Sequence, residues 1–62
     1  MLLTYIHKKT GKRYRLVCFA MNCTNGDHDG RPMVVYRDAL DASKIYTRCA
    51  NEFSQKFELE SA

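Results

Sequence analysis

The run Arg13–Met21 constrains the fold more than any other part of this sequence. In its first half, Arg13 and Arg15 alternate with apolar residues, and this period of two is that of a β-strand with one charged and one apolar face. In its second half, Val17–Met21, every position is apolar, so both faces of the strand are apolar there. The run therefore predicts one long strand whose far end is covered on both sides.

Three shorter runs are rich in the β-branched and aromatic residues that favour strands: Thr4–His7, Met33–Tyr36 and Ile45–Arg48. Turn-forming segments separate them. Gly11 can adopt a positive φ in the first turn, Asn22–Arg31 is the clearest loop, and Asp38–Lys44 is a polar connection. Pro32 suits the first position of a strand, where the ladder needs no N–H group. These runs predict a small antiparallel sheet.

The pattern changes near the end of the chain, because Ala50, Phe53 and Phe57 are spaced three and four residues apart, as on one stripe of a helix. The spacing predicts one helical turn with both rings in the core, and then a closing strand at Phe57–Leu59. The expected fold is mainly β: a small curved antiparallel sheet or a partly open SH3-like barrel of four to five strands, with one short C-terminal helical turn. Residues 1–62 are expected to form a single small domain.

Positive charge is concentrated in the first part of the chain. Residues 1–26 carry five basic side chains and no acidic one, whereas residues 27–62 carry five basic and seven acidic ones, and the net charge is +3. Such polarity favours an anionic partner. The candidate ligand-binding residues lie in a turn flanked by Tyr5 and Tyr14, whose rings could stack on a base: Lys8, Lys9, Lys12, Arg13 and Arg15. The alternative is a solvated turn whose charges serve solubility and whose tyrosines belong to the core.

Two further arginines, Arg37 and Arg48, extend this set of candidates because each stands at the end of a predicted strand beside a tyrosine-containing run. A guanidinium at a sheet margin can clamp a carboxylate or a phosphate through two hydrogen bonds while it packs on a ring. The alternative is an internal ion pair with one of the nearby acidic residues: Asp38, Asp41 or Glu52.

The sequence has no nucleophile elbow and no phosphate-binding glycine loop. His7, His28, Cys23 and Cys49 lack the paired spacing of zinc ligands, and His7 is expected to hydrogen-bond a tyrosine or a carboxylate instead. We therefore expect a non-enzymatic protein without catalytic residues, metal or cofactor.

The three cysteines show no C-x-x-C spacing, which indicates a reduced chain, and no run approaches the roughly 18 apolar residues of a membrane span. A cytoplasmic location without a membrane partner is the expectation. A chain of this size buries only about 60% of its unfolded surface. Pairing into a homodimer through an open sheet edge is therefore an expected route to extra stability.

The order of several motifs resembles a family of short bacterial and phage proteins classed as a domain of unknown function. Its pattern reads Tyr-x-His, Gly-x-x-Tyr, Val-Val-Tyr-Arg, an aromatic-x-Arg and a late Phe, and the matching positions here are Tyr5, His7, Gly11, Tyr14, Val34–Arg37, Tyr46, Arg48, Phe53 and Phe57. The chain departs from it at Tyr46, where Trp is common, and at Cys49, where Pro is common. The resemblance implies a compact β-barrel-like fold and a phage or prophage accessory gene, and it implies no reaction.

The function expected from these observations is that of a small binding module. Its ligand is expected to be anionic, either nucleic acid or a nucleotide, and to bind through the basic hairpin. The alternative is a protein-interaction module or inhibitor that acts on a host or phage protein. In that case the contact would run through a sheet edge or the loop Asn25–Gly30.

Overall fold

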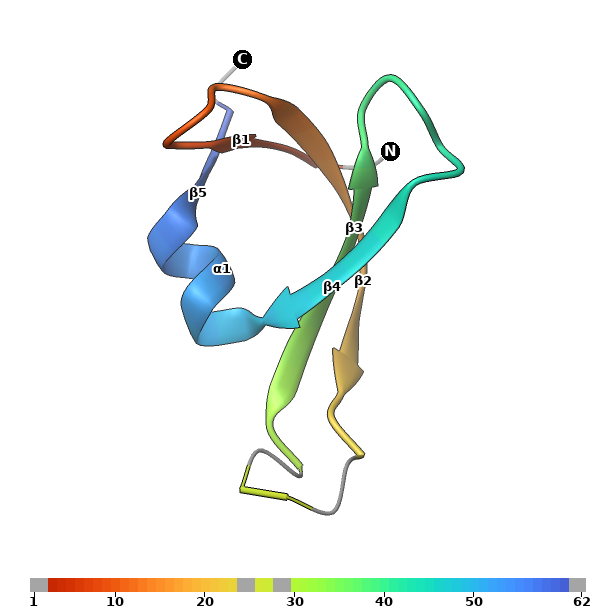
Figure 1. Cartoon of the computed structure of the whole chain (residues 1–62), viewed down its shortest axis with the longest axis vertical. Coiled ribbons are helices and arrows are strands. Elements are labelled where there is room, and N and C mark those ends of the chain that lie inside the picture. The colour runs from red at the N-terminus through yellow and green to blue at the C-terminus, as the bar shows by residue number, and fades with distance from the viewer. Residues whose placement is uncertain (1–2, 24–25, 28–29, 61–62) are drawn as a thin grey trace.

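The computed structural model describes residues 3–23, 26–27 and 30–60, and within them the chain is mainly β (Figure 1). Five antiparallel strands form one open sheet, with one short helix near the C-terminus. The elements are β1 (Thr4–His7), β2 (Arg13–Met21), β3 (Pro32–Asp38), β4 (Ile45–Cys49), α1 (Ala50–Lys56) and β5 (Phe57–Leu59). The predicted fold class is therefore confirmed.

The strands lie in the order β4-β3-β2-β1-β5. The first four strands form a meander of antiparallel neighbours, whereas β5 pairs with β1 at the other end of the sheet. Helix α1 carries the chain between these two ends, and Figure 1 shows it between β4 and β5. The topology thus brings the C-terminal end of the helix to the first hairpin turn.

A β-bulge interrupts the pairing of β2 with β3. Leu16 lies opposite Tyr36, but the next pair is Cys18 with Val35, so Val17 is an extra residue. Because successive side chains of a strand alternate between faces, one extra residue reverses the alternation. Phe19, which lies opposite Val34, therefore continues the same face as Leu16.

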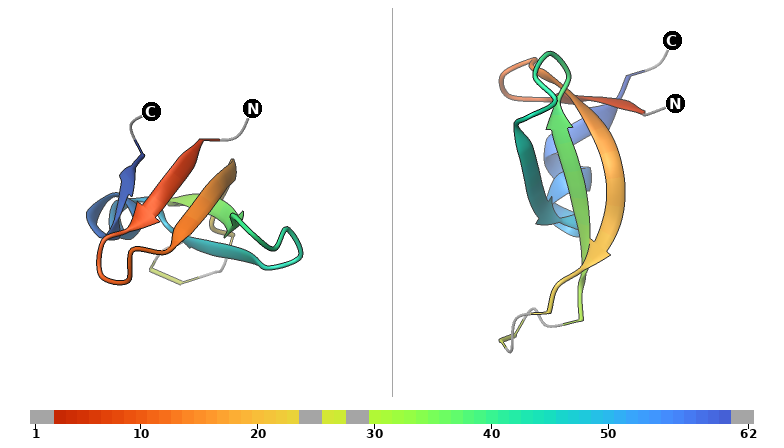
Figure 2. Two further views of the ribbon diagram at one scale, coloured as in Figure 1. Left: turned by 90° about the horizontal axis from the view of Figure 1, so that it is seen from above. Right: turned by 90° about the vertical axis from the view of Figure 1, so that its right-hand side faces the viewer.

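The prediction that the far end of β2 is covered on both sides is wrong. Phe19 is 72% exposed and Met21 is 67% exposed. Strand β1 pairs with β2 only as far as Thr4 opposite Arg15, and α1 packs against other strands. Strand β4 still pairs with β3 as far as Met33 opposite Cys49, and beyond this point the ends of β2 and β3 project as a two-stranded ribbon (Figure 2). Apolar composition indicates a tendency to be buried, but α1 packs against β3, β4 and β5 and leaves Phe19 and Met21 exposed.

The core lies between one face of the sheet and α1, and its buried members are Val34, Tyr36, Phe53 and Phe57. Phe53 of α1 stacks on Phe57, the first residue of β5, with ring centroids 4.3 Å apart. The prediction that both rings enter the core is confirmed. With only four buried apolar side chains among the described residues, each ring contact contributes a large share of the stability.

Candidate anion-binding site

The turn between β1 and β2 is fixed against the end of α1. The Lys8 N–H donates to the carbonyl of Lys56 at 2.9 Å, and Gly11 closes the turn with a φ of 75°, a value that favours glycine. This contact places the lysines of the turn beside the last residues of the helix. The resulting depression, which we call the basic cleft, has a volume of about 420 Å³ and is lined by His7, Lys8, Lys9, Arg48, Gln55 and Lys56.

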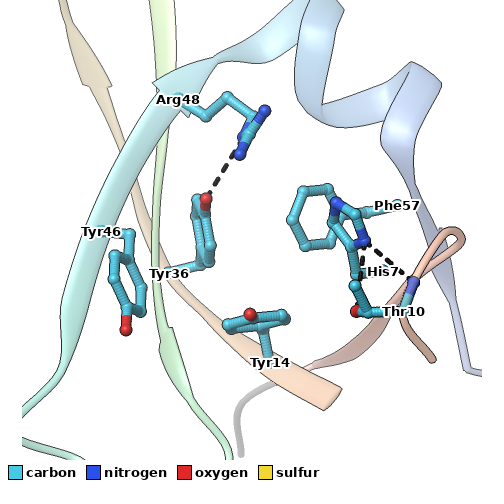
Figure 3. A pocket seen from close by; sticks show the side chains of 7 residues that line it. All are labelled: His7, Thr10, Tyr14, Tyr36, Tyr46, Arg48 and Phe57. Carbon is cyan, nitrogen blue, oxygen red and sulfur yellow. Dashed lines mark hydrogen bonds between the residues drawn. The ribbon is translucent and has the colours of Figure 1, made fainter. Parts of the chain in front are cut away.

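A second cavity, the aromatic pocket, adjoins the basic cleft and shares His7 and Arg48 with it (Figure 3). Its volume is about 220 Å³, and its lining consists of His7, Thr10, Tyr14, Tyr36, Tyr46, Arg48 and Phe57. Pockets for drug-sized ligands usually measure roughly 300–1,000 Å³. The aromatic pocket is therefore suited to one ring system rather than to a large cofactor.

Three tyrosines give this pocket its shape. The Tyr14 ring stands nearly perpendicular to Tyr36, with centroids 5.4 Å apart, and to Tyr46, with centroids 6.0 Å apart. Tyr36 is only 4% exposed and belongs to the core, whereas Tyr46 is 40% exposed. The pocket thus combines a fixed aromatic floor with an accessible ring at its margin.

Arg48 is held at the junction of the two cavities. Its Nε donates to the Tyr36 hydroxyl at 3.2 Å, its Nη1 pairs with Glu52, and its guanidinium lies 5.6 Å from the centroid of the Phe57 ring. The hydrogen bond to Tyr36 is the main cause that raises the pKa of Arg48, and burial opposes it. The internal ion pair considered from the sequence is present, and 28% of the Arg48 side chain is still exposed.

Glu52 is shared between two cations, since its Oε1 also lies 3.4 Å from Lys56 Nζ. Burial acts to raise the pKa of Glu52, but the attraction of Lys56 and the hydrogen bond from Arg48 outweigh it and lower this pKa. The basic cleft therefore has four cationic side chains around it and one carboxylate that partly neutralises them.

His7 joins the turn to the core. Its Nδ1 accepts from the Thr10 N–H and contacts the Thr10 hydroxyl, both at 3.3 Å, and its ring meets Phe57 edge to face at 4.9 Å. The predicted partner was a tyrosine or a carboxylate, so the structure gives a different partner. Because Nδ1 accepts the backbone N–H, the neutral ring carries its hydrogen on Nε2.

The other residues of the predicted basic hairpin lie away from the basic cleft. Lys12 Nζ is 2.9 Å from Asp38 Oδ2, and Arg13 Nε is 2.9 Å from Glu60 Oε1. The hydrogen bond between Lys12 and Asp38 is the main cause that raises the pKa of Lys12 and lowers that of Asp38. These two cations are engaged in joining the first turn and β2 to other parts of the sheet.

Arg15 and Arg37 lie opposite each other on β2 and β3. Since Tyr14 and Leu16 pack against the core, alternation places Arg15 on the other face of the sheet. Arg37 donates through Nη1 to the carbonyl of Asp38 at 3.3 Å, which differs from the side-chain ion pair considered from the sequence. Of the seven candidates, only Lys8, Lys9 and Arg48 line the basic cleft.

Sequence reasoning missed Lys56, Gln55 and Thr10 as parts of this site. Lys56 follows Glu52 by four residues in α1, so the two side chains lie on the same side of the helix, and this spacing is a local signal for their ion pair. Its position beside Lys8 depends on the pairing of β5 with β1, residues distant in sequence, and no local pattern indicates that pairing.

No family model, curated protein or solved structure matches this chain. The resemblance to the short bacterial and phage proteins therefore stays a prediction. Among residues 3–23, 26–27 and 30–60, no three His, Cys, Asp or Glu side chains are grouped so that they could hold a metal ion. His28 and much of the Asn25–Gly30 loop lie outside the described residues. Nor does any helix in the described part combine the length and apolarity needed to span a bilayer.

Proposed function

We propose that this chain is a non-enzymatic module that binds a nucleotide, either free or as part of a single-stranded nucleic acid. One observation carries the proposal: a ring-sized aromatic pocket opens beside a cluster of lysines and shares an arginine with it. Bases stack on aromatic side chains, and phosphates bind Lys and Arg. A ligand with both chemistries would use both cavities.

In this proposal the base enters the aromatic pocket beside the exposed Tyr46 ring, and the phosphate lies in the basic cleft. Lys8 and Lys9 make no ion pair with any described residue, so their charges are available to a ligand. Arg48 stands between the two groups and is oriented by Tyr36. The resemblance to short bacterial and phage proteins supports a role as a cytoplasmic phage or prophage accessory protein, and it supports an SH3-like barrel as the related fold.

The test is the fluorescence anisotropy of a labelled single-stranded oligonucleotide. The four cations that line the basic cleft are Lys8, Lys9, Arg48 and Lys56. If each contacts one phosphate of a single strand, the slope of log affinity against log salt is about −2.8, so affinity should fall about 50-fold between roughly 50 and 200 mM salt. Lys8→Glu should weaken binding strongly, whereas Lys44→Glu, the same charge change at an exposed turn away from the cleft, should have much less effect.

Two further arms identify the ligand. Replacing Tyr46 with leucine should weaken binding by about 5- to 100-fold if its ring stacks on a base, while Tyr46→Phe should keep the affinity. Adenosine monophosphate should displace the oligonucleotide if one nucleotide fills the site. Absence of binding at the lowest salt, or equal effects of Lys8→Glu and Lys44→Glu, would remove the proposal.

A further inference from the structure

Arg15 and Arg37 form a cationic pair on the side of the sheet away from the helix. They lie directly opposite each other on β2 and β3. Because Tyr14, Leu16 and Tyr36 pack in the core, alternation places both arginine side chains on the other face of the sheet, which we call the outer face. Neither arginine lines the aromatic pocket or the basic cleft. The pair therefore belongs to a surface separate from the proposed nucleotide site.

The two charges are not neutralised within the part of the chain that the structure describes. There, neither arginine forms an ion pair, and the Arg15 side chain makes no hydrogen bond. Arg37 donates through Nη1 to the Asp38 carbonyl at 3.3 Å, and a guanidinium has several further N–H donors. Both side chains are partly exposed. Like charges directly opposite on neighbouring strands destabilise a sheet, and an anion bound between them would remove this cost.

The neighbours of the pair on the outer face extend it into a row across four strands. Thr4 of β1 lies opposite Arg15, and Ile45 of β4 lies opposite Arg37. The Cβ atoms of directly opposite residues are about 4.5–5.5 Å apart, so both long arginine side chains can contact one ligand between them. The Thr4 hydroxyl, which makes no hydrogen bond among the described residues, adds a donor at one end. Ile45 is 61% exposed and adds apolar surface at the other.

We infer that this row binds a phosphorylated serine or threonine side chain of a partner protein. Charge complementarity selects the ligand. A phosphorylated side chain has a charge of about −1.5 to −2 at pH 7 and several strong acceptor oxygens, whereas a carboxylate has a single charge. The phosphate therefore matches the two guanidinium groups of Arg15 and Arg37, each of which can donate two parallel hydrogen bonds to it.

The absence of aromatic rings distinguishes this surface from the nucleotide site. The aromatic side chains of the described strands lie on the core face, so a base on the outer face would have no ring to stack on. A phosphate on a small side chain needs no such ring. The exposed Ile45 beside Arg37 gives apolar residues next to the phosphate a surface to contact. Pairs and clusters of arginine are a recurrent means of binding phosphorylated segments.

The test is a nuclear magnetic resonance titration of the isotope-labelled full chain with the capped peptide Ala-Val-phosphoserine-Val-Ala, from about 0.05 to 10 mM. The Nε–Hε signals of Arg15 and Arg37 should shift together along one saturable curve. Arg31, an exposed arginine just before β3, should not shift, and a shift of Arg48 would report binding in the basic cleft separately. The peptide with unmodified serine should not bind. Aspartate in place of phosphoserine should bind at least about fivefold more weakly, because it has a single charge.

A pair of matched variants tests the role of the charge. Arg37→Gln should raise the dissociation constant of the peptide, measured at Arg15, at least about fivefold, whereas Arg31→Gln should leave it unchanged. The melting temperature of Arg37→Gln should not fall, because the substitution removes one of two like charges, so weaker binding would not reflect a loss of fold. Three results would overturn the inference: no saturable shift of Arg15 and Arg37, equal effects of the two variants, or inorganic phosphate that binds as tightly as the peptide and so assigns the site to the free ion.

Discussion

The hydrogen bond from Arg48 to Tyr36 leads to a sharp prediction about a single oxygen atom. Tyr36→Phe removes the hydroxyl that accepts from Arg48 Nε at 3.2 Å and leaves the buried ring in place. Hydrogen bonds that involve a charged group contribute about 1.5–3 kcal/mol. Since 28% of the Arg48 side chain is exposed, water can replace part of this bond, and we expect a loss of about 1 kcal/mol.

That loss is measurable in so small a chain. The unfolding entropy of a 62-residue domain is about 130 cal/mol/K, so about 1 kcal/mol lowers the melting temperature by about 8 °C. Urea unfolding followed by far-ultraviolet circular dichroism measures the same change as a free energy. Tyr46→Phe is the matched control, because no hydrogen bond to the Tyr46 hydroxyl is found among the described residues, and it should change stability by less than about 0.5 kcal/mol.

The pairing of the two groups is tested by a double-mutant cycle. In an Arg48→Lys background, which keeps the charge but removes Nε, Tyr36→Phe should cost little. Equal losses from Tyr36→Phe and Tyr46→Phe, or an unchanged cost of Tyr36→Phe in the Arg48→Lys chain, would refute the reasoning. The orientation of Arg48 would then have another cause.

Two other predictions concern charge. Glu52→Gln removes the carboxylate that partly neutralises the basic cleft, so oligonucleotide affinity in the anisotropy assay should rise about two- to fivefold, and unchanged affinity would show that this carboxylate does not compete with the ligand. The pKa of Asp38 is lowered in the folded chain, so its contribution is complete above the ordinary aspartate pKa of about 3.9 and is lost as the pH falls through the lower folded value. The pKa of Lys12 is raised, so its contribution is complete below the ordinary lysine value and is lost as the pH rises through the higher folded one. Melting curves of Asp38→Asn should therefore depend less on acid pH than those of the wild type, whereas Asp27→Asn at an exposed position should match the wild type.

The first hairpin turn shows how far a local pattern can indicate a site. Sequence places the lysines on one turn because they are neighbours in the chain. It cannot say that Lys12 turns to Asp38 while Lys8 turns to the end of α1, because each contact depends on a strand pairing between distant residues. Arg48 was found beside a tyrosine-containing run, but the ring that orients it belongs to Tyr36 on the neighbouring strand.

The sequence by itself determined those features of local conformation that depend on residues close together in the chain. The period of two indicated β2, the spacing of Ala50 and Phe53 indicated the apolar stripe of α1, and Gly11 indicated a positive φ. Backbone steric preferences and side-chain alternation act over a few residues, so they can be predicted from the order of residues in a short segment.

Tertiary structure alone decided three other features: the pairing of β5 with β1, the bulge at Val17 and the exposure of the far end of β2. Each depends on which surfaces that are distant in sequence come into contact. The free energy of burial arises only when two surfaces remove each other from water, so neither segment determines it alone. For the same reason the run Val17–Met21 is a strand, as predicted, but it is exposed and not covered on both faces. An apolar run indicates that a partner surface is favourable, and only the arrangement of the whole chain shows whether the chain itself provides one.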